Sequence, residues 1–573
     1  MLINKLIVGL LLFLLVGCVN SPERDETESE VSVEVEKDKV EKRTEISPDV
    51  MYLLLTAEIA GQRNRYGVAL DGYLEAAKRV DDVRVTERAA KIGLFLKDNQ
   101  KTTEAVSLWL AQDGSNLTAR KIAVLSALKE GDEAKAVEHL NKMLEDDPAG
   151  FENTLLDLTR LLGKEVRADF LFNVLEGVAK KHPDHAVVFF VQAMLAGQLN
   201  KVEVAREKVN RAIALQPDWD KALILHAQLS VHRGDFDLAK ADLEKILKKS
   251  PENIRVRKLL AQVLMKSNAL DQAQAEYKKV LKTEVEDGES QFALALIYLQ
   301  QKNEKEASAY LKKLVNRRGW DAQASYYLGR LAFNNEHYDE ALVWFDKVTK
   351  GPYRYEASMA AVSVLLEQGN YLEAELRLKK LNENFPLKRI NILLLRAEVL
   401  TRQKKYQTAF DQLSRALKDF PEHRDLLYGR ALVAEKIDRL DVLESDLKRI
   451  LLKNPNDVAV LNALGYTLVD RTKRYTEAAK YLQQALKLSP ENPLIMDSMG
   501  WLMFKQGRYQ ESLDLLKAAY EKQTENEIAV HLAEVLQVLG RHEEANKLIK
   551  AAIDKTPDDE YLLRYKQRFP DEK

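Results

Sequence analysis

Residues 457–490 read DVAVLNALGYTLVDRTKRYTEAAKYLQQALKLSP, and residues 491–523 read ENPLIMDSMGWLMFKQGRYQESLDLLKAAYEKQ. Each half predicts a pair of helices. In the second helix of the first pair, the spacing i, i+3, i+7, i+10 of one helix face is held by Tyr475, Ala478, Leu482 and Ala485. Pro490 follows, and proline ends a helix because it lacks an N–H and clashes with the preceding turn. A hairpin with one apolar side needs a neighbour of the same kind to bury it.

The same frame recurs along the chain. An anchor at position n is followed by a small or apolar residue at n+3, by apolar residues at n+7 and n+10, and often by proline at n+15. The anchors are 33 to 35 residues apart, at positions 202, 236, 270, 304, 338, 371, 406, 440, 475, 509 and 542. A register held over this length predicts a regular array of helix hairpins over residues 201–557.

This period, with glycine in first helices at Gly329, Gly465 and Gly500, resembles the tetratricopeptide repeat (TPR) family. The resemblance implies an all-α, TPR-type solenoid of helix hairpins that winds into a superhelix. Residues 49–200 follow the plan less cleanly, with Tyr66 as the first anchor. We expect about 15 helix pairs between residues 49 and 557. Residues 558–573 then hold a capping helix, Glu560–Phe569, and a short tail.

The first residues are typical of an export signal. Lys5 precedes an apolar core at residues 6–16, which is too short to span a bilayer but suits a signal peptide over residues 1–17. The end of this core, LVGC at residues 15–18, resembles the bacterial lipobox. That resemblance implies cleavage before Cys18 and lipidation of Cys18; the alternative is a free cysteine in an uncleaved anchor. Val19 follows in place of the aspartate that retains such lipoproteins in the inner membrane, so we expect an outer-membrane lipid anchor that faces the periplasm.

Residues 18–48 predict a disordered acidic tether. Residues 19–48 contain ten acidic and five basic residues and no aromatic residue. Low hydrophobicity and like charge keep such a segment unfolded. Ser47 and Pro48 then predict a helix start.

Composition and motifs disfavour nucleic-acid binding and catalysis. The net charge is −2, without the basic excess that phosphate binding requires. No GxGxxG occurs, and Gly163-Lys164 is followed by glutamate, so no phosphate-binding loop is predicted. His182 and His185 lack a further metal ligand nearby in sequence, and Cys18 is the only cysteine. We therefore expect no enzyme activity, no cofactor and no metal.

Stacked hairpins with a constant rotation form a long concave surface, which first helices line in TPR proteins. The first-helix positions that we expect to be exposed there, and to bind a partner, are Tyr326, Arg330, Asn462, Tyr466, Asp497, Trp501 and Glu534. Tyr466 and Trp501 follow the glycine in adjacent repeats, so they are predicted to stack along the inner wall as anchors for a protein partner. The alternative is that both rings pack between repeats and serve only the core.

Lipobox, tether and full-length array together resemble the LbcA-type outer-membrane lipoproteins that bind a carboxyl-terminal-processing protease. The segments that carry this resemblance are LLLTAEIAGQR at 53–63, LNALGYTLVDRTKRY at 461–475 and DSMGWLMFKQGRY at 497–509. It implies an adaptor that recruits the protease and delivers cell-wall hydrolases as substrates. The alternative hypothesis is a TPR lipoprotein that assembles outer-membrane barrels, secretins or an exopolysaccharide export machine.

Overall fold

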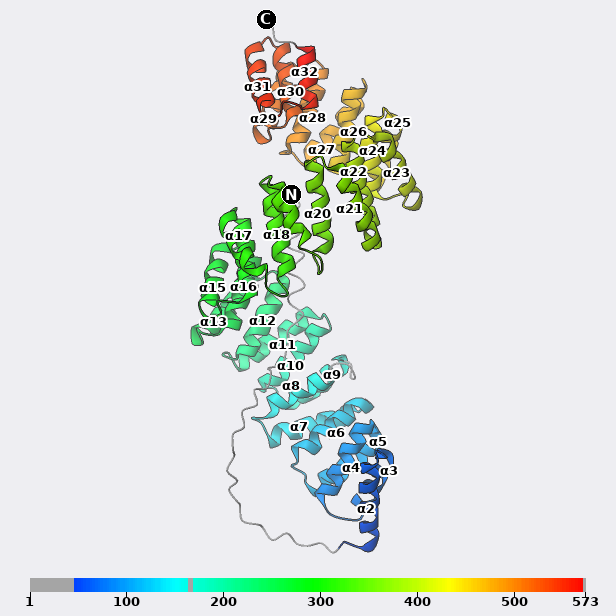
Figure 1. Ribbon diagram of the computed structural model, residues 1–573. Helices are drawn as coiled ribbons and strands as arrows, with labels where there is room; N and C mark the ends of the chain where they lie inside the picture. The colour runs from blue at the N-terminus through cyan, green and yellow to red at the C-terminus, as the bar shows by residue number, and fades with distance from the viewer. Residues whose placement is uncertain (1–45, 163–167, 570–573) are drawn as a thin grey trace. The chain divides into compact units, whose positions relative to one another are not determined.

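The structure is a computed structural model that describes residues 46–162 and 168–569 (Figure 1). Within these residues the chain is helical, with one short 3-10 turn at Pro386–Lys388. The first helices of the successive pairs are α2 (Pro48–Gln62), α4 (Val83–Leu96), α6 (Leu117–Glu130), α8 (Phe151–Leu162), α10 (Ala186–Gln198), α12 (Asp220–Arg233), α14 (Ile254–Lys266), α16 (Gly288–Gln300), α18 (Asp321–Asn334), α20 (Arg354–Glu367), α22 (Arg389–Arg402), α24 (Arg424–Lys436), α26 (Val458–Arg471), α28 (Pro493–Lys505) and α30 (Asn526–Val538).

Each first helix is followed by a second helix. The second helices are α3 (Tyr66–Ala77), α5 (Asn99–Gln112), α7 (Glu133–Asp146), α9 (Ala168–Lys181), α11 (Val202–Leu215), α13 (Phe236–Lys249), α15 (Leu270–Thr283), α17 (Glu304–Leu314), α19 (Tyr338–Asp346), α21 (Tyr371–Asn384), α23 (Tyr406–Asp419), α25 (Leu440–Lys453), α27 (Tyr475–Leu488), α29 (Tyr509–Lys522) and α31 (His542–Lys555). A last helix, α32 (Glu560–Arg568), follows the fifteenth pair. In the described residues, the predicted fold class and the predicted number of pairs are therefore confirmed.

All eleven predicted anchors are the first residues of second helices, from Val202 of α11 to His542 of α31. A left-handed residue two positions before most anchors ends the first helix; examples are Asn200 (φ 57°), Gly234 (φ 88°) and Gly507 (φ 78°). The predicted small residue at n+3 is fully buried in most pairs, as Ala478 is. The period therefore fixes both the turn and the packed face of each hairpin.

The first-helix glycines allow the two helices of a hairpin to approach closely. A Cβ atom on Gly465 would lie 2.6 Å from Cγ of Leu482, and one on Gly500 would lie 2.7 Å from Cγ of Leu516. Leu482 and Leu516 occupy the n+7 position of their second helices. Glycine is thus the residue that lets this leucine pack against the facing backbone.

The chain divides into two compact units, residues Met1–Leu225 and His226–Lys573, with the division inside α12. In the first unit, α2 to α6 share a core with Trp109 and small residues such as Ala69 and Ala105. In the second unit, a core that extends from α22 to α28 includes Leu413, Leu447 and Leu482. Each unit thus builds its core from successive hairpins.

The predicted signal peptide at residues 1–17, Cys18, and all of the predicted tether except its last three residues lie outside the described residues. Ser47 caps α2 through its side chain, and Pro48 occupies the first turn, as the sequence predicts. None of the described helices combines the length and the apolar character needed to cross a bilayer.

Candidate functional site

In the second unit, α26, α28, α30 and α32 pack side by side. Internal first helices are covered on nearly all sides: α28 buries every residue from Ile495 to Leu502, and α30 buries every residue from Ile528 to Leu536. These runs include polar side chains. Burying a polar group costs free energy unless it is hydrogen-bonded, so their partners define the site.

His531 lies at the centre of this buried group. Its Nδ1 atom is 2.9 Å and 3.1 Å from the two carboxylate oxygens of Asp497 on the preceding first helix. The indole ring of Trp501 stacks on the imidazole with 4.1 Å between centroids and 17° between planes. The ring of Tyr466 on α26 lies 6.0 Å away. One imidazole therefore joins side chains from three successive repeats.

The charge state of His531 follows from these contacts. Burial by itself lowers the pKa of an imidazole, but the attraction and hydrogen bond of Asp497 outweigh it, with further attraction from Glu527 and Glu534. The pKa of His531 is therefore raised above its ordinary value. A protonated imidazole paired with Asp497 is a buried ion pair that holds α28 and α30 in register.

Trp501 connects this ion pair to the outside. Its Nε1 atom donates a hydrogen bond to the exposed carboxylate of Asp470 at 3.2 Å. The ring of Phe504 also stacks with the indole at 4.9 Å between centroids, and the ammonium group of Lys505 lies 4.3 Å from the indole centroid. The indole is thus fixed by hydrogen bonding, stacking and a cation–π contact.

Tyr466 makes a contact that skips one repeat. Its hydroxyl donates a hydrogen bond of 2.6 Å to Glu527 on α30, 61 residues further along the chain. Burial raises the pKa of the Tyr466 hydroxyl, and the charge of Glu527 raises it further. Because α28 lies between these two helices in sequence, the bond requires the row of first helices to curve toward its inner side.

Three acidic residues and one tyrosine interact on the inner side, and we call this surface the inner wall: Glu435 of α24, Asp470 of α26, Glu527 of α30 and Tyr561 of α32. Burial raises the pKa of the Glu435 carboxyl; nearby cations oppose the shift, and the charges of Asp470 and Glu527 strengthen it. Burial and Glu527 also raise the pKa of Tyr561. The inner wall is therefore acidic and aromatic.

The last helix closes the group. Glu534 is buried in α30, and both of its carboxylate oxygens accept hydrogen bonds from Arg568 of α32, at 2.6 Å and 3.1 Å. This bidentate pair is the strong form of a charge-assisted hydrogen bond. The predicted capping helix thus docks through a specific polar contact as well as through Leu562 and Tyr565.

The predicted exposure of the first-helix positions is wrong for four residues: Tyr326, Asp497, Trp501 and Glu534 are only 4%, 4%, 3% and 4% exposed. The reason is that adjacent first helices pack on each other, so a position that one hairpin leaves open is covered by the next. Tyr466 and Trp501 each contact His531. The predicted stacking pair is therefore replaced by a cluster with an imidazole as the common neighbour.

The structure does not bring Tyr326 and Arg330 into this cluster. Both lie on α18, where Arg330 donates a hydrogen bond to the Tyr326 hydroxyl at 3.2 Å and Tyr353 stacks on Tyr326 at 5.0 Å. Asn462 of α26 is partly buried, and its Oδ1 atom has no hydrogen-bond partner among the described residues.

Sequence reasoning missed His531, Glu527 and Arg568. One signal was present: His531 follows Asp497 by 34 residues, and Arg568 follows Glu534 by 34 residues. Opposite charges at the same repeat position of adjacent hairpins predict a pair between them. No group of three metal-binding side chains occurs in the described residues.

Comparison with known proteins identifies the family. The tetratricopeptide repeat profile matches residues 231–297 and 503–568, and a second one matches 394–442 and 444–493. The chain is 37% identical over 539 residues to the TPR repeat-containing protein PA4667 of Pseudomonas aeruginosa, an alignment that covers 93% of this chain and 90% of the relative. The chain belongs to the tetratricopeptide repeat family. TPR proteins are scaffolds for protein–protein interactions and are generally not enzymes.

Solved TPR structures are similar to parts or most of the chain. One match is a chain in the crystal structure of the APC/C hetero-tetramer Cut9–Hcn1. The match covers 80% of this chain and 97% of that chain, with 15% identity and a TM-score of 0.31. The match to the TPR protein TTC0263 of Thermus thermophilus covers 30% of this chain and 96% of that chain, with 22% identity and a TM-score of 0.29. A profile of anaphase-promoting complex subunit 3 also matches residues 268–348.

Proposed function

We propose that this protein is a periplasm-facing outer-membrane lipoprotein that acts as an adaptor. Its TPR array binds a carboxyl-terminal-processing protease together with the cell-wall hydrolases that the protease cleaves. The lipid on Cys18 and the tether of residues 18–48 hold the array at the membrane. Such an adaptor accelerates cleavage by raising the local concentration of substrate, without supplying a catalytic group.

The observation that carries the binding role is the construction of the inner wall. Buried Trp501, His531 and Asp497 hold the first helices in place, whereas Asp470 and Tyr561 remain exposed on the surface above them. Rigid support beneath exposed polar and aromatic groups lowers the entropy cost of binding. The buried residues position the wall, and the exposed residues contact the partner.

The lipobox LVGC at residues 15–18 supports the membrane anchor, and the nearly full-length relative supports a role shared across the whole array. No cofactor is required for this function. Charge on the inner wall favours a partner with a positively charged segment, because complementary potentials speed association and reject wrong partners.

A pull-down from detergent-solubilised envelope tests the proposal. We expect the full chain to recover a PDZ-bearing serine protease. Asp470→Lys reverses an exposed charge on the inner wall and should reduce recovery about tenfold. Asp514→Lys, at an exposed position of the second helix α29, is the matched control and should bind normally. Both variants should keep the helical circular-dichroism signal.

Two results would contradict the proposal. Equal recovery with both variants would exclude the inner wall as the binding surface. Recovery of barrel-assembly, secretin or exopolysaccharide-export components in place of a protease would instead favour the assembly-factor alternative. Replacing Trp501 or Tyr466 is a weaker test, because each ring is packed inside the wall and its loss disturbs the support as well as the surface.

A further inference from the structure

Helix α2 is covered on one side only. It buries Val50, Ala57 and Ala60 against α3, whereas α30 buries nine consecutive residues. Its other side carries a row of exposed apolar residues: Met51 (52%), Tyr52 (71%), Leu55 (59%) and Ile59 (49%). We call this row the α2 stripe.

The two described ends of the array differ in polarity. At the far end, four of the nine residues of α32 (EYLLRYKQR) are charged. In the fifteen residues of α2 (PDVMYLLLTAEIAGQ) only Asp49 and Glu58 are charged, and Glu58 is engaged by Tyr73 and Arg88. Solenoids need a polar outer face where they end, and a contiguous apolar surface marks a contact site.

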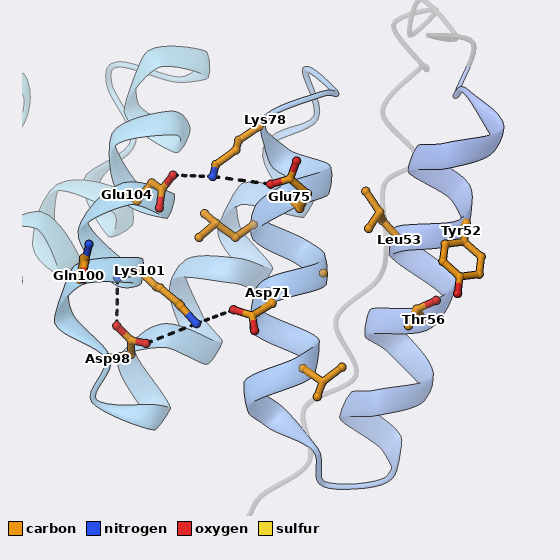
Figure 2. A pocket seen from close by; sticks show the side chains of 13 residues that line it. Tyr52, Leu53, Thr56, Asp71, Glu75, Lys78, Asp98, Gln100, Lys101 and Glu104 are labelled. Atoms are coloured by element: carbon orange, nitrogen blue, oxygen red, sulfur yellow. Dashed lines mark hydrogen bonds and ion pairs between the residues drawn. The ribbon is translucent and has the colours of Figure 1, made fainter.

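A groove of about 600 Å³ lies beside the stripe, between α2, α3 and α5 (Figure 2). Figure 2 shows Tyr52 and Thr56 on the α2 side of it and ion pairs on the other side. There, Lys78 pairs with Glu104 at 2.8 Å, and Lys101 pairs with Asp71. These charges already pair with one another between α3 and α5. A partner that covers the apolar stripe and the groove would therefore leave few charges without partners.

The charges at the two ends of α2 are opposite and unpaired. Asp49 lies in the first turn and Arg63 directly follows the last turn; both are exposed, and neither forms an ion pair among the described residues. They are 14 residues apart, about 21 Å along a helix. An antiparallel second α2 would place its own Arg63 opposite Asp49 and its own Asp49 opposite Arg63. The charge pattern is therefore complementary to itself.

We propose that the α2 stripe pairs with the α2 stripe of a second copy of this chain, antiparallel and about a two-fold axis near Thr56. In such an isologous interface, if a residue of one copy contacts a second residue on the other copy, the reverse contact also forms. Apolar residues fill the centre, and two Asp49–Arg63 pairs flank it. This pairing goes beyond the adaptor function, since it would place two inner walls in one particle and allow bivalent binding.

The oligomeric state of the full chain in detergent micelles tests the pairing. Sedimentation velocity should show a dimer that dissociates on dilution, and Leu55→Glu should yield a monomer. Leu452→Glu removes a leucine that is 83% exposed on α25 and should leave the dimer intact. Asp49→Arg or Arg63→Asp alone should weaken the dimer roughly tenfold, because like charges then face each other. The double variant should restore it, as only an antiparallel self-pairing predicts.

A cross-linking experiment in membranes checks the axis. Thr56→Cys should form a covalent dimer with a short bis-maleimide, whereas Leu452→Cys and the parent chain with Cys18 alone should not. A wild-type chain that stays monomeric, or a double charge reversal that fails to restore a dimer, would overturn the proposal. If the chain is a monomer and Leu55→Glu abolishes protease recovery, the stripe binds another protein and self-pairing is wrong.

Discussion

Nδ1 of His531 lies 2.9 Å from Oδ1 of Asp497, and both side chains are buried between α28 and α30. The two residues hold the same repeat position in adjacent hairpins. A buried ion pair contributes little over a well-packed apolar pair, but losing one member is costly because the other charge stays buried. The pair therefore makes correct stacking of these repeats a condition for satisfying both charges.

Each single substitution in this pair should lower the local stability far more than the substitution of both residues together. Asp497→Leu leaves the imidazole without its partner, and we expect a loss of roughly 3–5 kcal/mol of local stability. His531→Phe keeps the stack on Trp501 but strands Asp497, with a similar loss. Asp497→Leu combined with His531→Phe should recover most of it. Hydrogen exchange of the amides in α28 and α30 measures the local stability of each variant. If the loss in the double variant equals the sum of the two single losses, Asp497 and His531 are not coupled.

The stability of the same repeats should fall as pH rises. The pKa of His531 is raised in the folded chain, so its contribution is fully present below the unfolded value of about 6.5 and is lost as pH rises through the folded pKa. The raised pKa of the Glu435 carboxyl also makes the stability of the folded chain fall as pH rises, but in a lower pH range. Hydrogen exchange between pH 6 and pH 9 should show the decline for α28 and α30.

His531→Gln is the control for this pH dependence. Its stability should be lower at pH 6 and nearly constant up to pH 9, since the titrating imidazole is absent. The groups that face the imidazole are the carboxylates of Asp497, Glu527 and Glu534 and the rings of Trp501 and Tyr466. An unchanged slope in His531→Gln would assign the decline to another group.

The first-helix glycines should not tolerate a side chain. Gly465→Ala places a methyl group 2.6 Å from Cγ of Leu482, and we expect an overpacking cost of about 1–3 kcal/mol that exceeds the gain in helix propensity. Gly67→Ala in α3 is the control, because no atom lies within 4 Å of its added Cβ. It should be neutral or stabilising by up to about 1 kcal/mol. Thermal unfolding followed by circular dichroism separates the two outcomes.

The docking of α32 should depend on one arginine. Arg568→Ala leaves the buried Glu534 carboxylate unpaired, so α32 should detach more often and be cut faster in limited proteolysis. Arg564→Ala removes only an exposed pair with Glu560, which is worth about 0.3–0.5 kcal/mol. Equal cleavage of the two variants would show that apolar contacts alone hold the helix.

The repeat architecture could be predicted from sequence because its causes are local. Anchors such as Tyr475, the small residue three positions later and the turn before them act within one hairpin of about 34 residues, and a helix face has a fixed spacing. The first-helix glycines are part of the same local pattern. All eleven predicted anchors and the fifteen pairs follow from these spacings, whereas α32 is expected because a solenoid needs a polar closing face.

The inner wall could not be predicted from spacings in the sequence. Whether Trp501 meets solvent, and whether Tyr466 reaches Glu527 two repeats away, depends on the small rotation between successive hairpins. That rotation is the sum of many packing contacts and leaves no spacing in the sequence. The chain by itself determined which residues form each hairpin, because those forces act over short distances along it. Only the tertiary structure decided which of them are buried, because burial depends on neighbours that the curvature brings together.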